Sequence, residues 1–162
     1  MTSKEKIPYE DEFRQIIFIL QDLVDQANAQ AVYLIDKGGQ LIARYGKDEG
    51  LDVTSLASLT ASSIAAAEGL ADLLGEKAFS LLFHEGERDN VHLSLIAEKL
   101  VLIVIGERES SLGLVRMRVR NAVADLTAII EQLIEAVKQD KDDVDIPFAE
   151  ITDEDIDNMF DL

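Results

Sequence analysis

The sequence of 162 residues predicts an α+β sandwich, in which helices cover both faces of one antiparallel sheet. Three long stretches carry apolar residues at the spacing of a helix. Five short runs rich in β-branched and aromatic residues lie between them, and tight turns separate these runs. The last of the short runs is apolar throughout. The expected order is helix, strand, strand, helix, strand, strand, strand, helix. The sheet would have five strands, with the second helix on one face and the first and third helices on the other.

Periodicity and turn residues set the expected boundaries. The predicted helices cover residues 9–28, 53–74 and 112–138, and the predicted strands cover residues 30–36, 40–46, 78–85, 91–97 and 100–106. Gly38-Gly39 forms the turn of the first hairpin. Asp52 or Thr54 can cap the second helix and Ser111 the third, because their side-chain oxygens accept hydrogen bonds from free amides of the first turn. The apolar strand 100–106 is expected at the centre of the sheet.

The second predicted helix is unusual because residues 53–67 contain no charged residue, although 29% of the chain is charged. One side is expected to pack on the sheet through Leu56, Leu59, Ser63, Ala67, Leu70 and Leu74. The opposite side carries small residues where a helix facing solvent normally carries charged ones. We interpret that side as a contact surface for a second copy of the chain or for another protein. The alternative is a helix buried on all sides within one domain.

Composition excludes several classes of protein. The net charge of −17 disfavours binding to nucleic acid or to an anionic membrane surface. No apolar run has the length of a membrane span, and the first residues lack the apolar core of a signal peptide, so a cytoplasmic protein is expected. The chain has no cysteine, which excludes disulfides, thiol catalysis and cysteine-ligated metals.

Candidate chemical groups are few. The sequence contains no phosphate-binding loop and no dinucleotide fingerprint. His84 and His92, with Glu85, can in principle hold a metal, but such histidines are more often ordinary strand residues. In the strand 91–97, His92 and Ser94 alternate with apolar residues, so their face is expected to be the less buried one. We therefore expect no catalytic residues, no metal and no cofactor.

The end of the chain forms a separate acidic unit. Residues 141–162 contain nine acidic residues and one lysine, so we expect one domain at 1–140, followed by a linker and a short C-terminal helix. Thr152 is a good N-cap, and Ile151 and Ile156 have the spacing of a hydrophobic staple.

This short helix is predicted to dock into a groove, on a partner or on its own domain. The alternative is a frayed acidic terminus. The predicted docking residues are Phe148, Ile151, Ile156, Met159 and Phe160. The early third helix carries three arginines that either face solvent or receive such an acidic segment, namely Arg116, Arg118 and Arg120.

Several segments together resemble the roadblock/LC7 family. They are KGGQLI at 37–42, DVTSLASLTASSIAA at 52–66, FHEG at 83–86 and SLGLVRMRV at 111–119. The tail PFAEITDEDIDNMF at 147–160 also resembles the chain end of one bacterial branch of this family, whose members regulate a Ras-like GTPase. The resemblance covers nearly the whole chain.

The resemblance implies a roadblock/LC7 fold and a homodimer in which two sheets join edge to edge at the strand 78–85. The implied dimer-edge residues are Phe79, Leu81 and Phe83. It also implies that the paired second helices form a platform for one small Ras-like GTPase. The implied platform residues are Ser58, Ala61, Ser62, Ala65, Glu68, Gly69 and Asp72.

The implied function is that of a GTPase-activating regulator in bacterial polarity or motility, which is not itself an enzyme. Such a regulator inserts no arginine finger, so Arg44, Arg88 and Arg108 need not be catalytic. The tail is expected to contact the GTPase away from the nucleotide and to affect exchange. One alternative is a scaffold that tethers a GTPase complex without altering hydrolysis. A small-molecule sensor is a weaker alternative, because the apolar sheet offers no polar cluster for a ligand.

Overall fold

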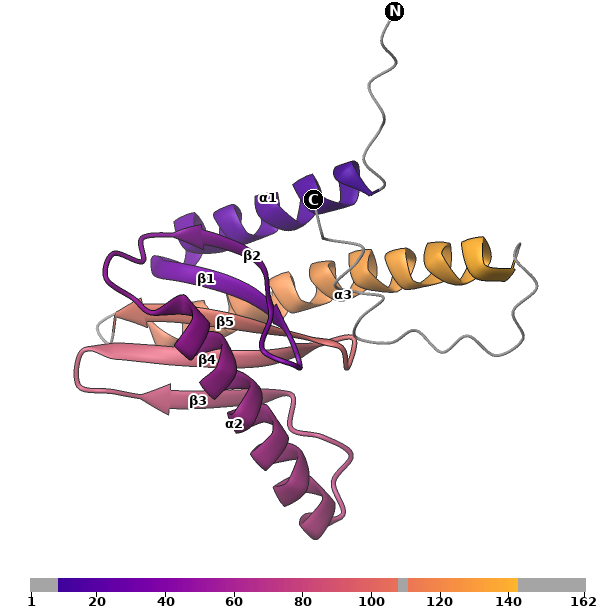
Figure 1. The fold of residues 1–162 in the computed structure, drawn as a ribbon. Coiled ribbons are helices and arrows are strands. Elements are labelled where there is room, and N and C mark those ends of the chain that lie inside the picture. The colour runs from indigo at the N-terminus through magenta and orange to yellow at the C-terminus, as the bar shows by residue number, and fades with distance from the viewer. Residues whose placement is uncertain (1–8, 108–110, 143–162) are drawn as a thin grey trace, which may run out of the picture.

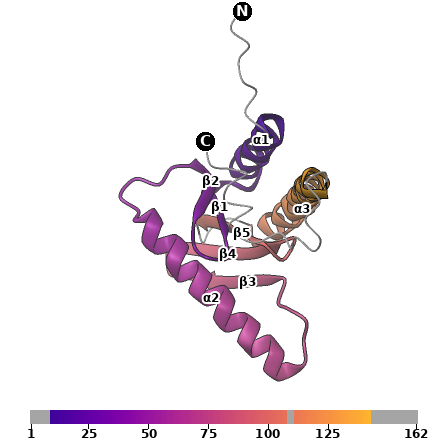
Figure 2. The ribbon, with the colours of Figure 1, turned by 45° about the vertical axis from the view of Figure 1, so that its right-hand side comes forward.

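A computed structural model describes residues 9–107 and 111–142 of the chain. The helices are α1 (Glu10–Ala27), α2 (Val53–Leu74) and α3 (Leu112–Asp142); the strands are β1 (Ala29–Asp36), β2 (Leu41–Gly46), β3 (Leu81–Glu85), β4 (Asp89–Ile96) and β5 (Leu100–Glu107). The sheet separates α2 on one face from α1 and α3 on the other (Figures 1 and 2). The predicted α+β sandwich and its element order are confirmed.

The five strands form one sheet in the order β2-β1-β5-β4-β3, and every neighbouring pair is antiparallel. The apolar strand β5 lies at the centre, as predicted. Strands β2 and β3 form the two edges. Strand β3 begins only at Leu81, where the connection from α2 first pairs with β4, so the predicted start at Ala78 is wrong. Phe79, a predicted dimer-edge residue, therefore precedes the strand.

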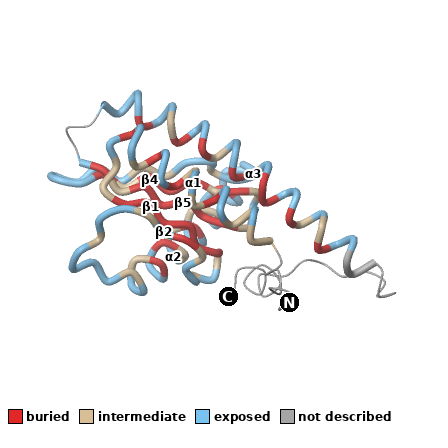
Figure 3. Tube along the Cα trace, turned by 90° about the horizontal axis from the view of Figure 1, so that it is seen from above, coloured by how far each residue is buried: buried red, intermediate tan, exposed pale blue. Residues whose placement is uncertain are grey.

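The core has two layers because side chains of a strand alternate between its faces. Val32 and Leu34 of β1 point into the larger layer, which α1 and α3 close. Tyr33 and Ile35 point into the smaller layer, which α2 closes. Burial along the tube in Figure 3 follows this division, with buried positions on the inner sides of the helices and exposed ones outside.

The face of β4 that carries His92 and Ser94 was predicted to be the less buried one, and this prediction is wrong. His92 is only 2% exposed and Ser94 only 3%, whereas on the other face Leu93 is 2% exposed and Val91 and Leu95 are half-buried. The reason is that α3 packs against the His92 face of β4. A polar residue in a strand is thus no sign that its face meets solvent.

The predicted orientation of α2 is also wrong. Its buried residues are Ala57, Thr60, Ile64 and Ala71, while the leucines predicted to face the sheet at positions 59, 70 and 74 are exposed. The hairpin turn lies so close to the helix that a Cβ on Gly39 would be 3.3 Å from the Ala57 carbonyl oxygen. Such close packing requires small residues on the inner side of α2. The predicted cap is confirmed, because the Ser55 amide donates to Asp52 Oδ1 over 3.1 Å.

Tyr33 of β1 allows the packing of the smaller core layer to be tested. Its side chain is buried and its hydroxyl has no hydrogen-bond partner among the described residues. Burial, with a smaller contribution from Asp48, raises the pKa of Tyr33 to about 12. Tyr33→Phe should leave the free energy of unfolding unchanged or raise it by about 1 kcal/mol, because it removes an unsatisfied polar group. Urea unfolding measures this, with Tyr45→Phe as control. A clear loss of stability only in Tyr33→Phe would contradict it.

Candidate protein-interaction site

The outward side of α2 carries most of the residues predicted to bind a partner. Five of the seven are exposed, and we call these five the outer α2 surface: Ser58, Ser62, Ala65, Gly69 and Asp72. The other two, Ala61 and Glu68, are half-buried. The Ser62 hydroxyl donates to the Ser58 carbonyl oxygen over 3.1 Å, within the helix itself. The outer α2 surface is therefore made of small residues with one charge, at Asp72, so covering it with a partner requires little desolvation of charged groups.

Glu68 is engaged within the chain. Its carboxylate accepts from the Lys37 ammonium at 2.5 Å, which ties the β1–β2 hairpin to α2. Both side chains are partly exposed, so solvent weakens this ion pair. Its clearest effect is to orient the helix relative to the hairpin, and a partner would meet Glu68 only at the border of the outer α2 surface.

Four exposed leucines flank the outer α2 surface, and the sequence did not reveal them as a surface. They are Leu59, Leu70, Leu73 and Leu74, of which Leu73 is 84% exposed. The last three of them lie in the final turns of α2, and this end of the helix projects past the edge strand β3 in both ribbon views (Figures 1 and 2). Clustered exposed leucines are typical of a surface that a protein covers. The helical spacing of Leu59, Leu70 and Leu74 predicted that they would face the sheet, and no role was predicted for Leu73.

The edge strand β3 adds a second apolar element near this end of the molecule. Leu81 is exposed and Phe83 is half-buried. The Phe83 ring packs on the ring of His92, with centroids 4.7 Å apart, and the guanidinium of Arg116 lies 5.8 Å from its centroid. Within the described chain, β3 pairs with β4 alone, so its other edge offers free backbone groups.

The two histidines do not come together. Phe83 pairs with His92 and His84 pairs with Val91, so His84 and His92 point to opposite faces of the sheet. No group of three or more potential metal-binding side chains occurs among the described residues. Burial and the nearby charge of Arg116 lower the pKa of His92. Its Nδ1 is buried without a hydrogen-bond partner in the described chain.

His92 should therefore make the fold sensitive to acid. Its pKa is lower in the folded chain than in the unfolded chain, so below about pH 6.5 the unfolded state binds a proton first. The free energy of unfolding should be highest above that pH and fall as the pH drops towards the folded pKa. Urea unfolding at several pH values should show a smaller fall in His92→Gln than in the unmodified chain. His84→Gln, at an exposed position, should behave like the unmodified chain. Equal slopes in all three would contradict this role.

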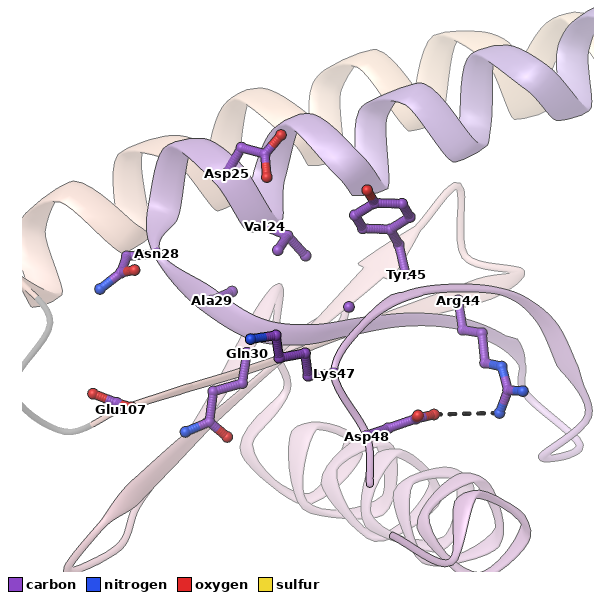
Figure 4. A pocket seen from close by; sticks show the side chains of 11 residues that line it. Val24, Asp25, Asn28, Ala29, Gln30, Arg44, Tyr45, Lys47, Asp48 and Glu107 are labelled. Carbon is purple, nitrogen blue, oxygen red and sulfur yellow. Dashed lines mark hydrogen bonds and ion pairs between the residues drawn. The ribbon is translucent and has the colours of Figure 1, made fainter. Parts of the chain in front are cut away.

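A large open hollow lies elsewhere, where the end of α1 meets β2 and the loop after it (Figure 4). Its volume is about 960 Å³. Asp25 and Glu107 face Arg44 and Lys47 across it, and Arg44 forms an ion pair with Asp48 at 3.2 Å. The charges thus oppose one another, and no described lining residue pairs a nucleophile with a base. The polar loop 47–52 gave no indication of this hollow.

Some predicted residues cannot be placed. Arg108 and the five predicted docking residues of the tail lie outside the described residues. Arg116 and Arg120 are exposed on α3, and Arg118 is half-buried. In the part of the chain that is described, no helix combines the length and the apolar character needed to span a membrane.

Comparison with known proteins identifies relatives of this fold. A family model for the roadblock/LC7 domain matches residues 16–106. The chain is 45% identical to Myxococcus xanthus MglB, with a TM-score of 0.73 over 75% of this chain and 98% of that one. It is 25% identical to the gliding protein MglB of Thermus thermophilus, with a TM-score of 0.73 over 81% and 99% of the two chains. An MglB structure described as having a tetrameric arrangement is 27% identical, with a TM-score of 0.71 over 81% and 98%. Curated protein sequences give no match.

Proposed function

Since this chain belongs to the roadblock/LC7 family, we propose that it is a cytoplasmic, non-catalytic regulator that activates an MglA-type small Ras-like GTPase. The observation that carries the proposal is the outer α2 surface, a nearly uncharged stripe on an exposed helix of a chain with net charge −17. Such a stripe suits contact with another folded protein better than contact with solvent. The process that the pair serves would be cell polarity or motility.

The proposed regulator acts as a homodimer. Two copies would join at the open edge of β3, with Leu81 near the seam. The end of α2, which carries exposed leucines, projects past that same edge, so the second copy could cover them (Figure 2). Two α2 helices would then lie side by side and present one continuous platform to a single GTPase.

Activation would not use an arginine finger from this chain. Arg44 is held by Asp48 at the β2 edge, and Arg88 lies in the turn between β3 and β4. Neither arginine is on the outer α2 surface. The platform would instead hold the switch regions of the GTPase in the arrangement that favours hydrolysis, and the catalytic groups would belong to the GTPase.

A second contact is proposed for the tail. Helix α3 continues to Asp142, past its predicted end at residue 138, so the proposed acidic linker begins at residue 143. Residues 143–162 would form this linker and a short helix that reaches the GTPase away from its nucleotide. That contact would promote nucleotide exchange, while the platform promotes hydrolysis. The proposed contact residues are Phe148, Ile151, Ile156, Met159 and Phe160.

Single-turnover GTP hydrolysis by the small GTPase encoded in the same genome tests the proposal. The rate should rise when the purified chain is added, and the chain alone should hydrolyse no GTP. A tight complex with an unchanged rate would favour the scaffold, which is the second candidate function. Absence of binding in either nucleotide state would reject both.

A further inference from the structure

The helices α1 and α3 pack against each other on the face of the sheet opposite α2 (Figure 2). Two adjoining hollows of about 250 and 620 Å³ make up a groove, and both are lined by Phe18, Ile19 and Asp125. The larger one continues to Ala128 and Ile129. We call this feature the α1–α3 groove.

Two side chains in the α1–α3 groove lack the partners that their chemistry requires. Phe18 is 67% exposed, although burial of an aromatic ring is strongly favourable. Arg118 Nε is shielded from solvent and has no hydrogen-bond partner in the described chain. Leaving such a donor unpaired is costly. The groove therefore needs an occupant with an apolar face and a carboxylate.

We propose that residues 147–162 of the same chain occupy the α1–α3 groove when no other partner is bound. These residues supply both required groups: an apolar face at Ile156, Met159 and Phe160, and several acidic side chains that can accept from Arg118. Alone, so short a helix is marginal in water, so a surface that buries its apolar face would stabilise it.

The reach of the chain permits this docking. Helix α3 ends at Asp142, and Ile129 in the groove lies about 20 Å back along the helix axis. Residues 143–155 span about 43 Å when extended, so the segment can turn back and run antiparallel to α3. Covalent attachment through a short segment gives an effective concentration on the order of mM, so even weak affinity for the groove suffices.

Charge restricts the arrangement of the docked segment. Asp22 and Asp125 line the groove and would repel the acidic tail, while Arg14 at one end is paired with Glu10 at 2.7 Å. Apolar contact must therefore provide most of the attraction, and Arg118 fixes the position of one carboxylate. High salt should change the docking only modestly, because it screens both the repulsion and the Arg118 contact.

This docking does not depend on the GTPase role, but it would regulate that role. The tail cannot occupy the α1–α3 groove and contact a GTPase at once. A free regulator would therefore keep its tail covered, and the GTPase would have to displace it.

Because the chain has no cysteine, one introduced cysteine gives a single labelling site. A nitroxide on Asp157→Cys of the otherwise unmodified full chain should broaden amide NMR signals along the groove, at Phe18 and Ala128, without any GTPase. The broadening should be lost in Phe18→Ser, whose site is exposed and not needed for the core. It should persist in the matched control Leu51→Ser, which removes an exposed apolar residue from the loop before α2.

Three outcomes would overturn the proposal. The first is that no amide signal is broadened, and the second is that the broadening is centred on α2. The third is that signals of the groove are broadened only when an isotope-labelled chain is mixed with a separate nitroxide-labelled chain. The last result would assign the tail to a neighbouring copy. GTP hydrolysis takes no part in the readout, so failure here leaves the proposed GTPase role untouched.

Discussion

Ala65→Arg is expected to abolish stimulation of GTP hydrolysis, so that the GTPase hydrolyses GTP at the rate it has without the regulator. Ala65 lies in the middle of the outer α2 surface and is exposed. A long charged side chain there would hold the two proteins apart and leave a desolvated charge at their interface. Arginine is a good helix former, so the fold should be retained. Single-turnover hydrolysis at saturating regulator measures the effect.

The matched control places the same substitution on the other side of the sheet. Ala124→Arg, at an exposed alanine of α3, should leave both the stimulation and the fold unchanged. Sedimentation and circular dichroism should show that both variants remain folded and keep the same oligomeric state. Undiminished stimulation by Ala65→Arg would show that the outer α2 surface is not the GTPase contact.

Gly46→Ala is expected to destabilise the fold by about 3 kcal/mol or more. Gly46 has φ +113°, and a Cβ there would overlap the Gln30 carbonyl oxygen and lie 2.7 Å from Ala31 Cα. Both contacts are with the backbone of β1, so the strands would have to separate. The Lys47 amide donates to the same Gln30 oxygen at 2.8 Å, and that hydrogen bond would be disturbed. Urea denaturation of the full chain measures the loss.

Gly50→Ala separates steric conflict from backbone strain. Gly50 also has positive φ, at +75°, but a Cβ there would meet nothing within 4 Å. Its substitution should cost only the strain of the left-handed conformation, about 1–2 kcal/mol. If the two variants lose the same free energy of unfolding, strands β1 and β2 can separate at Gly46 without cost, which would contradict the prediction.

The parts of the fold that sequence predicts well are those whose apolar pattern allows only one placement. Helix α1 has a distinct buried stripe, and strand β5 is apolar on both faces and can only lie inside the sheet. Helix α2 is the opposite case. With no charge between residues 53 and 67, several sides satisfy the helical spacing, and only the close approach of the hairpin decides which side turns inward.

Contacts between distant segments explain the remaining differences. His92 is buried because α3 crosses β4, and nothing near His92 in the sequence indicates this. The α1–α3 groove likewise depends on residues about a hundred positions apart. The small residues of the outer α2 surface could be recognised from missing charge alone, whereas the exposed leucines beside them looked like core.

One crosslinking measurement tests the central claim, that the GTPase rests on the outer α2 surface. A photoreactive group would be attached to the single cysteine of Ser62→Cys, with Glu131→Cys on exposed α3 as the matched control. With the GTPase bound to a non-hydrolysable GTP analogue, Ser62→Cys should give a crosslinked adduct that weakens with GDP, and Glu131→Cys should give none. An adduct only from Glu131→Cys, or none from Ser62→Cys in a complex that still forms, would contradict the claim.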